Sequence, residues 1–252
     1  MKIILQNITK SFNSPSGDLM IFENLNINIS SNEFVSILGP NGCGKTTLLN
    51  LINGIDKDYS GLIKIKSKNN KQDFAYMMQK DLLLPWRTVY KNIVIGLEID
   101  GRMNSHTRDL VLEYLDKFGI SNLIDSYPMK LSGGERQKVA LVRTLILDSE
   151  ILLLDEPFSS IDYNTRLELQ SKFYHLAKER NKTVLLITHD IDEAIAVSDR
   201  VIIFNQKPYG INKDFKLKMD IENRSPITTR QHSDFAKYFN LIWNSLPKNN
   251  NK

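Results

Sequence analysis

The fold is decided by the segment Gly39-Pro40-Asn41-Gly42-Cys43-Gly44-Lys45-Thr46, which matches the pattern G-x-x-x-x-G-K-[ST]. The segment follows the apolar run 34–38, which predicts a strand, and precedes Leu48, Leu49 and Ile52, whose spacing predicts a helix. An ordinary glycine-rich turn is the alternative, but it would not require a strand before it and a helix after it. The order of the three pieces therefore predicts an α/β fold with a phosphate-binding loop.

Each part of this loop has an expected role toward phosphate. Its glycines allow unusual dihedral angles, so that backbone N–H groups point inward, and the helix that follows adds partial positive charge. Lys45 is expected to neutralise the β- and γ-phosphates, and the Thr46 hydroxyl to bind Mg²⁺. The whole stretch from Gly39 to Thr47 is predicted to contact the nucleotide.

Two adjacent acids end a second apolar run, Ile151-Leu152-Leu153-Leu154-Asp155-Glu156. Neighbouring carboxylates are costly to bury unless a cation lies beside them, although a strand that ends in a solvated acidic turn would be equally common. In a chain with a phosphate loop, the pair predicts that Asp155 holds Mg²⁺. Glu156, one residue further on, is predicted to act as general base for the attacking water.

The remaining pattern divides the chain into a core and two additions. The runs 151–154 and 184–187 are apolar throughout, as in parallel strands that are buried on both faces. Residues 3–8 and 24–29 alternate instead, which predicts antiparallel strands with one wet face. The strand signal disappears from about 81 to 148, where apolar residues recur at helical spacing. We therefore expect an α/β P-loop NTPase (RecA-like) core with an N-terminal antiparallel β subdomain and an inserted helical subdomain.

The C-terminal part has a weaker pattern. Residues 205–230 are rich in Lys and Asn, and they look irregular. Phe235, Phe239, Ile242 and Leu246 have the spacing of an amphipathic helix, which we expect to pack on its own domain rather than on a partner. The chain is accordingly divided into a P-loop NTPase domain, 1–230, and a C-terminal amphipathic helix and tail, 231–252.

Composition and charge exclude several classes of protein. The chain of 252 residues is 41% hydrophobic and 25% charged, which is typical of a folded soluble protein. No apolar run approaches the roughly 20 residues needed to cross a bilayer, and no signal-peptide core follows Met1, so we expect a cytosolic chain. A net charge of +4 without a basic block argues against nucleic acid as a partner. The single cysteine, Cys43, excludes an internal disulfide and a cysteine-based zinc site.

The segment Leu131-Ser132-Gly133-Gly134-Glu135-Arg136-Gln137 resembles the signature motif of ABC-transporter ATPase subunits. Ser132 and Glu135 have capping-box spacing, and Gly133 and Gly134 leave N–H groups exposed at the positive end of a helix. Taken alone, the segment could be merely a well-capped helix. In the ABC family this site closes over the γ-phosphate held by the other subunit's P-loop, which implies a homodimer with two ATP molecules between its subunits. The family usually has Gln at the position of Glu135, and we expect Glu135 to turn back and cap its own helix.

The other family positions occur in the expected order, up to about residue 204. By this resemblance Phe12 stacks on adenine, and Gln79 senses Mg²⁺ and the attacking water. Asp162 reaches across the dimer, and His189 contacts the γ-phosphate and orients Glu156. In isolation, a Phe in a strand more often belongs to the core, and a His at a strand end is usually structural. The resemblance thus implies ATP and Mg²⁺ as cofactors, with catalytic residues Lys45, Gln79, Glu156 and His189 and metal ligands Thr46, Gln79 and Asp155.

The segment Leu83-Leu84-Pro85-Trp86-Arg87-Thr88-Val89 is similar to ATPase subunits of importers of nitrate, taurine and aliphatic sulfonates. In such subunits this region receives the coupling helix of the membrane permease. Pro85 and Trp86 are therefore expected to form an interface anchor, with coverage of the chain's own helical core as the alternative.

This subgroup implies a peripheral protein at the cytoplasmic face of the membrane. There it would drive import of a small solute through permease subunits, together with an extracytoplasmic solute-binding protein. The alternative is a soluble ABC ATPase without a permease, of the iron–sulfur assembly, repair or translation type. The repair type carries long coiled-coil insertions and the translation type carries two cassettes, whereas this chain has one P-loop and one signature motif.

Overall fold

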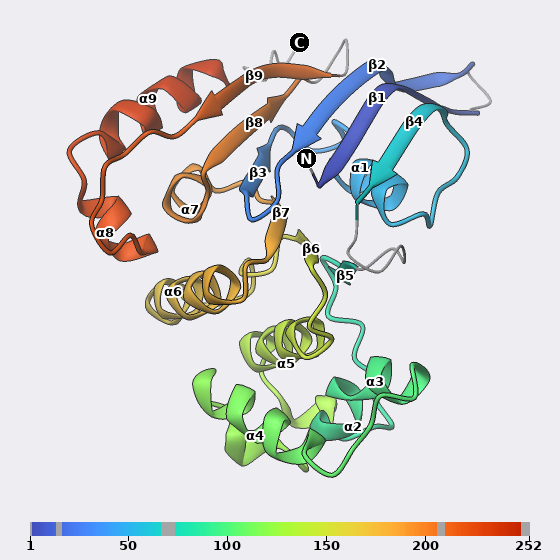
Figure 1. Cartoon of the computed structure of the whole chain (residues 1–252), viewed down its shortest axis with the longest axis vertical. Coiled ribbons are helices and arrows are strands. Elements are labelled where there is room, and N and C mark those ends of the chain that lie inside the picture. Colours follow the sequence, from blue (N-terminus) through green and yellow to red (C-terminus); the bar gives the residue numbers. More distant parts are fainter. Residues whose placement is uncertain (1, 14–16, 67–73, 206–209, 248–252) are drawn as a thin grey trace.

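A computed structural model describes residues 2–13, 17–66, 74–205 and 210–247. Within these residues the central sheet has six strands in the order β5-β6-β7-β3-β8-β9 (Figure 1). Its strands are β3 (Phe34–Leu38), β5 (Phe74–Met77), β6 (Ile151–Asp155), β7 (Thr183–Ile187), β8 (Arg200–Phe204) and β9 (Ile211–Lys216). All neighbours are parallel except β8 and β9. Every residue of β3, β6 and β7 is buried, which confirms the prediction from their apolar runs.

A second sheet, antiparallel and with the strand order β2-β1-β4, lies beside the central one (Figure 1). Its strands are β1 (Ile3–Phe12), β2 (Leu19–Ile29) and β4 (Ser60–Ile65). The predicted antiparallel strands at 3–8 and 24–29 are confirmed as parts of β1 and β2. Between these strands, the sequence Asn13-Ser14-Pro15-Ser16-Gly17 predicts a turn, but its residues 14–16 lie outside the described residues.

The central sheet is covered on both faces. Alternate residues of β6 point to opposite sides, because side chains along a strand alternate. Ile151 and Leu153 belong to a core shared with the antiparallel sheet and with α1 (Lys45–Ile52). Leu152 and Leu154 belong to the core on the other side, together with α6 (Tyr163–Glu179). The strands that carry the predicted site residues are therefore held from both sides.

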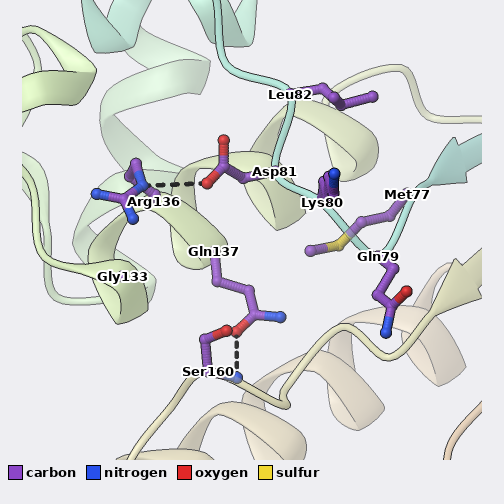
Figure 2. A pocket seen from close by; sticks show the side chains of 9 residues that line it. All are labelled: Met77, Gln79, Lys80, Asp81, Leu82, Gly133, Arg136, Gln137 and Ser160. Carbon is purple, nitrogen blue, oxygen red and sulfur yellow. Dashed lines mark hydrogen bonds and ion pairs between the residues drawn. The ribbon is translucent and has the colours of Figure 1, made fainter.

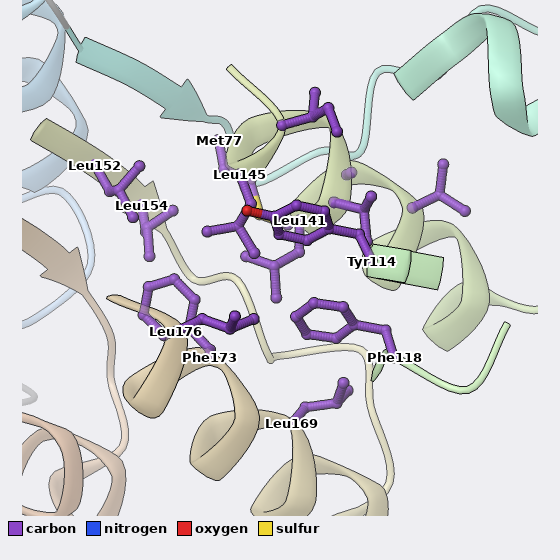
Figure 3. Close-up of a cluster of buried hydrophobic side chains, with 14 of the residues drawn as sticks. Met77, Tyr114, Phe118, Leu141, Leu145, Leu152, Leu154, Leu169, Phe173 and Leu176 are labelled. Carbon is purple, nitrogen blue, oxygen red and sulfur yellow. The ribbon is translucent and has the colours of Figure 1, made fainter. Parts of the chain in front are cut away.

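Helices replace strands between about residues 81 and 148, as predicted. They form the lower lobe in Figure 1 and comprise α2 (Val89–Ile93), α3 (Ile95–Ile99), α4 (Thr107–Lys117), the 3-10 turns η1 (Ser121–Leu123) and η2 (Pro128–Lys130), and α5 (Gly133–Leu145). Figure 3 shows that Tyr114 and Phe118 of this lobe pack in one cluster with Leu154 of β6 and Phe173 of α6. The helical lobe and the central sheet thus share a continuous hydrophobic core.

The C-terminal region is more ordered than its sequence suggested. The interpretation of residues 205–230 as irregular was wrong, because they contain β9 and α8 (Pro226–Gln231). β9 pairs with β8 at the edge of the sheet and is half-exposed, so it has no apolar run. The predicted C-terminal helix is α9 (Phe235–Ser245), and Ile242 packs with α7 (Ile191–Val197) and β8, which confirms that the helix packs on its own domain. None of the helices in the described residues is both long and apolar enough to cross a membrane.

Candidate active site

The phosphate loop turns the chain sharply between β3 and α1. Gly44, immediately before α1, has a φ of 95°, a left-handed value that favours glycine. A Cβ atom on Gly44 would lie 2.8 Å from side-chain atoms of both Ile21 and Phe22 on β2. Because Gly44 has no side chain, the loop can lie close to the antiparallel sheet. The glycine would also let a phosphate come close to the loop.

The loop and the two acids share one cavity of about 410 Å³. It lies at the carboxyl ends of the parallel strands, where open α/β sheets generally bind ligands. Lys45 Nζ donates to the carbonyl oxygens of Gly39 at 2.7 Å and Pro40 at 2.9 Å, so its charge is held within the loop. The cavity is lined by Ile21, Asn41, Gly42, Gly44, Lys45, Thr46, Thr47, Gln79, Asp155 and Glu156. Residues from distant parts of the chain that were assigned to one nucleotide are thus brought together.

Thr46 and Asp155 form the part of this cavity that suits a metal ion. The Thr46 hydroxyl donates to Asp155 Oδ2 at 2.8 Å. Asp155 is only 3% exposed, and burial, together with the negative charge of Glu156, raises the pKa of its carboxyl group. A hydroxyl and a carboxylate are hard oxygen donors of the kind that Mg²⁺ prefers. The donor set therefore fits Mg²⁺, whose positive charge would offset the burial of the carboxylate.

The carboxylate of Glu156 lies between a glutamine and a histidine. Its Oε2 accepts from Gln79 Nε2 at 3.3 Å, and its Oε1 lies 3.3 Å from His189 Nδ1. The three residues follow β5, β6 and β7, which are adjacent in the sheet, so the strand order itself places them in a row. Glu156 has a φ of 50°, and such strain in a residue other than glycine is concentrated at functional sites.

The side chains of Cys43 and Phe12, both predicted to contact the nucleotide, do not line this cavity. The Cys43 thiol is fully buried on the inner side of the loop, toward Gly39 and Phe204, and burial raises its pKa. Contact of Cys43 with phosphate would therefore be through its backbone. Phe12 ends β1 with 42% of its surface exposed, and Lys10 Nζ lies 4.6 Å from its ring centroid.

The signature segment forms a capped helix start, as predicted. Ser132 is the N-cap of α5, and its Oγ accepts from the Glu135 N–H at 3.3 Å. Glu135 Oε2 accepts from both the N–H and the Oγ of Ser132 at 2.8 Å. The expectation that Glu135 turns back onto its own helix is thus confirmed, and these hydrogen bonds lower the pKa of its carboxyl group.

A second cavity, also of about 410 Å³, lies beside the signature helix (Figure 2). It is lined by Met77, Gln79, Lys80, Asp81, Leu82, Gly133, Arg136, Gln137 and Ser160. Gln79 lines both cavities, but no residue of the phosphate loop lines the second one. Gly134 lies near Ser160, and Asp162 caps α6 by accepting from the Thr165 N–H at 3.1 Å. The signature residues and Asp162 are therefore not gathered around the phosphate loop of their own chain.

Two arginines of α5 form hydrogen bonds to the segment that follows Gln79. Arg136 Nε donates to Asp81 Oδ2 at 3.1 Å, as Figure 2 shows, and Arg143 donates to the Asp81 and Leu82 carbonyls at 2.5 Å and 3.0 Å. Trp86, a few residues further on, is 72% exposed. The alternative in which Trp86 covers the helical core is therefore wrong.

Gln137 is a site residue that the sequence analysis missed. Its Nε2 donates to the Glu156 carbonyl at 3.1 Å. Its Oε1 accepts from the Ser160 N–H at 2.9 Å, as Figure 2 shows. The side chain is buried and bridges α5 to the loop that carries Glu156. A polar residue on the buried face of a helix was the available signal, but its partners could not be inferred from the sequence.

The comparisons with known proteins agree on one family. A family model described as ABC transporter matches residues 22–159. The uncharacterized ABC transporter ATP-binding protein YtlC of Bacillus subtilis (strain 168) is 36% identical over 245 residues, or 96% of this chain and 94% of that protein. The aliphatic sulfonates import ATP-binding protein SsuB of Bacillus cereus (strain ZK / E33L) is 36% identical over 239 residues, 93% and 91% of the two chains. A dimeric post-hydrolysis structure of the ATP-binding cassette MJ0796, bound to ADP and Pi, superposes with a TM-score of 0.77 at 30% identity, covering 86% and 99% of the chains.

Proposed function

Because this chain belongs to the ABC transporter family as an ATP-binding subunit with ATPase activity, we propose that two copies close around two MgATP molecules and drive solute import. The solute would be a small molecule of the sulfonate, taurine or nitrate class, and it would pass through a separate permease. The observation that carries the proposal is the Glu156 carboxylate, 3.3 Å from both Gln79 and His189 and beside the phosphate loop. The chain would work at the cytoplasmic face of the membrane.

In this proposal the cavity residues divide the work of hydrolysis. Lys45 and the loop N–H groups bind the phosphates, and Thr46 and Asp155, with Gln79 nearby, would hold Mg²⁺, whose charge would offset that of the phosphates. Glu156 accepts a proton from the attacking water. Gln79 and His189 each contact one oxygen of Glu156, so the carboxylate is oriented before the water arrives.

The homodimer completes each site with residues from the other copy. The signature residues Ser132, Gly133 and Gly134 start a second helix whose N–H groups favour an anion, yet no phosphate-loop residue of the same chain lines the cavity beside them. An anion bound at the phosphate loop of a partner would accept hydrogen bonds from these N–H groups. Asp162 lies at the start of α6, the helix that follows the loop carrying Glu156. The dimeric state of the MJ0796 cassette supports this arrangement.

The surface around the second cavity is the proposed docking site for the permease. Leu82 lines this cavity, and Pro85 and Trp86, a few residues further along the chain, are exposed. They offer a rigid segment with an aromatic side chain, a residue class that often dominates interfaces. Gln79 connects this region to the phosphate cavity, because it lines both. The import function of SsuB supports the direction of transport, and import would also require a solute-binding protein outside the membrane.

The proposal is tested by Glu156→Gln. The variant keeps the size of the side chain but loses the base, so steady-state phosphate release should fall by about 10²- to 10⁴-fold while MgATP binding is retained. Gel filtration with MgATP should then show a stable dimer. Glu179→Gln, at the exposed end of α6, removes the same charge as a matched control and should hydrolyse ATP at the wild-type rate. Wild-type turnover by Glu156→Gln would refute the assigned base.

A further inference from the structure

The helix α8 reaches into the core of the ATPase domain through Arg230. This helix packs against α6 and α7, and the Arg230 side chain is mostly buried between them. Its Nε donates to Asp192 Oδ1 at 2.6 Å, and its Nη2 donates to Gln170 Oε1 at 2.8 Å. A third bond, from Nη1 to the Pro226 carbonyl at 3.0 Å, fixes the guanidinium on its own helix. Arg230 therefore joins α8 to both neighbouring helices at once.

Gln170 connects Arg230 to the buried carboxyl group of Glu193 through hydrogen bonds. Because its Oε1 accepts from Arg230, its Nε2 faces Glu193, and it donates to Glu193 Oε1 at 3.2 Å. Gln170 is 1% exposed and Glu193 is 4% exposed. If the Gln170 amide were flipped, its NH₂ group would lie against the Arg230 guanidinium, and two donors would face each other. Arg230 therefore selects the amide orientation in which Gln170 donates to Glu193.

Glu193 in turn holds the two residues on either side of His189. The Thr188 hydroxyl donates to Glu193 Oε2 and accepts from the Asp190 N–H at 3.1 Å. The Asp190 carboxylate accepts from the Glu193 N–H at 3.3 Å. His189 itself is exposed between these fixed neighbours, with its ring directed at Glu156.

We propose that Arg230 is a positioning residue for hydrolysis, which acts through Gln170, Glu193 and Thr188 to fix the backbone that carries His189. The helix α8 thereby helps to orient the catalytic carboxylate, although it lies outside the phosphate cavity. This inference rests on the proposed role of His189. The effect is expected in kcat rather than in nucleotide affinity, because the chain of contacts ends at His189 and not at the phosphate loop.

Arg230→Met tests the inference, since it removes the donors and keeps the apolar stem. Steady-state kcat should fall roughly tenfold while KM for MgATP stays within about twofold, because a small displacement of a catalytic group mainly affects the transition state. Arg230→Lys should recover part of the loss, since one ammonium can reach one of the two acceptors. Lys237→Met on α9 removes an exposed positive charge and should keep wild-type kcat.

A double variant separates this linkage from general destabilisation. Thr188→Val breaks the same chain of contacts at its other end, so adding Arg230→Met to it should lower kcat no further. The inference is overturned if Arg230→Met lowers only the melting temperature and leaves kcat unchanged, or if the two kcat losses multiply. An equal loss of MgADP affinity would also overturn it. The proposed function fails separately, through an active Glu156→Gln.

Discussion

Glu193 is a carboxyl group buried in α7, and Glu193→Gln tests what its charge does to stability. Burial raises the pKa of Glu193 from 4.5 to about 7, and the nearby Asp190 adds to the effect. Hydrogen bonds from Thr188 and Gln170 and the positive charge of Arg166 oppose it. The folded protein therefore binds this proton more tightly than the unfolded chain does.

The sign and size of the effect follow from this difference in proton affinity. The protonated Glu193 stabilises the folded protein fully below about pH 4.5, and this stabilisation is lost as the pH rises to about 7. The reason is that Glu193 loses its proton at a lower pH in the unfolded chain than in the folded protein. With about 1.4 kcal/mol for each pKa unit, this one group should lower the free energy of unfolding by about 2.5 kcal/mol between about pH 5 and pH 8. For a chain of this length, the corresponding change in melting temperature is roughly 5–10 °C.

The assay compares thermal unfolding of wild type and Glu193→Gln, without nucleotide, at both pH values. Glutamine does not titrate, and every other group titrates in both proteins, so the difference between them isolates Glu193. As the pH rises from about 5 to about 8, the free energy of unfolding of the variant should increase by about 2.5 kcal/mol relative to that of the wild type. Its melting temperature should increase by roughly 5–10 °C relative to that of the wild type. Glu179→Gln serves as the control for loss of a surface carboxylate. If the difference between variant and wild type is the same at both pH values, the reasoning is refuted.

Two further predictions concern Cys43 and Trp86. Because the Cys43 thiol is buried and burial raises its pKa, the folded protein should react with iodoacetamide at least about 100-fold more slowly than the guanidinium-unfolded chain; similar rates would mean that the thiol is accessible. Trp86→Ala should leave kcat of the isolated chain within about twofold of wild type, because the side chain is exposed, but should release the chain from membranes that contain a co-expressed permease. Retention of the variant in that membrane fraction would contradict the docking surface.

The parts of the site that were predicted from sequence depend on neighbours in the chain. The phosphate loop directly follows β3, and the acids at 155 and 156 lie at the end of β6. The carboxyl ends of parallel strands meet at one edge of the sheet, so these residues share one cavity. The capping box of Ser132 and Glu135 spans three residues, so its hydrogen bonds could be inferred from spacing alone. Apolar runs likewise predicted β3, β6 and β7 of the central sheet, and alternation predicted parts of β1 and β2 of the antiparallel sheet.

The parts that were missed depend on residues far apart in the chain. β9 is a half-exposed edge strand, so its sequence carries neither an apolar run nor a clear alternation. Gln170, Glu193 and Arg230 meet only because three helices pack together, and each alone would be expected on a solvated surface. Gln137 is similar, since its partners are the backbone groups of a loop whose path no local pattern predicts.

The burial of Cys43 makes this chain suitable for site-directed spectroscopic labelling without prior mutation. It is the only cysteine in the sequence, and its sulfur faces the core. A cysteine introduced at an exposed position such as Tyr163, beside Asp162, would then be the one thiol that a polar maleimide reaches readily in the folded protein. A spin label or fluorophore placed there would report the separation of two copies as MgATP is added and consumed.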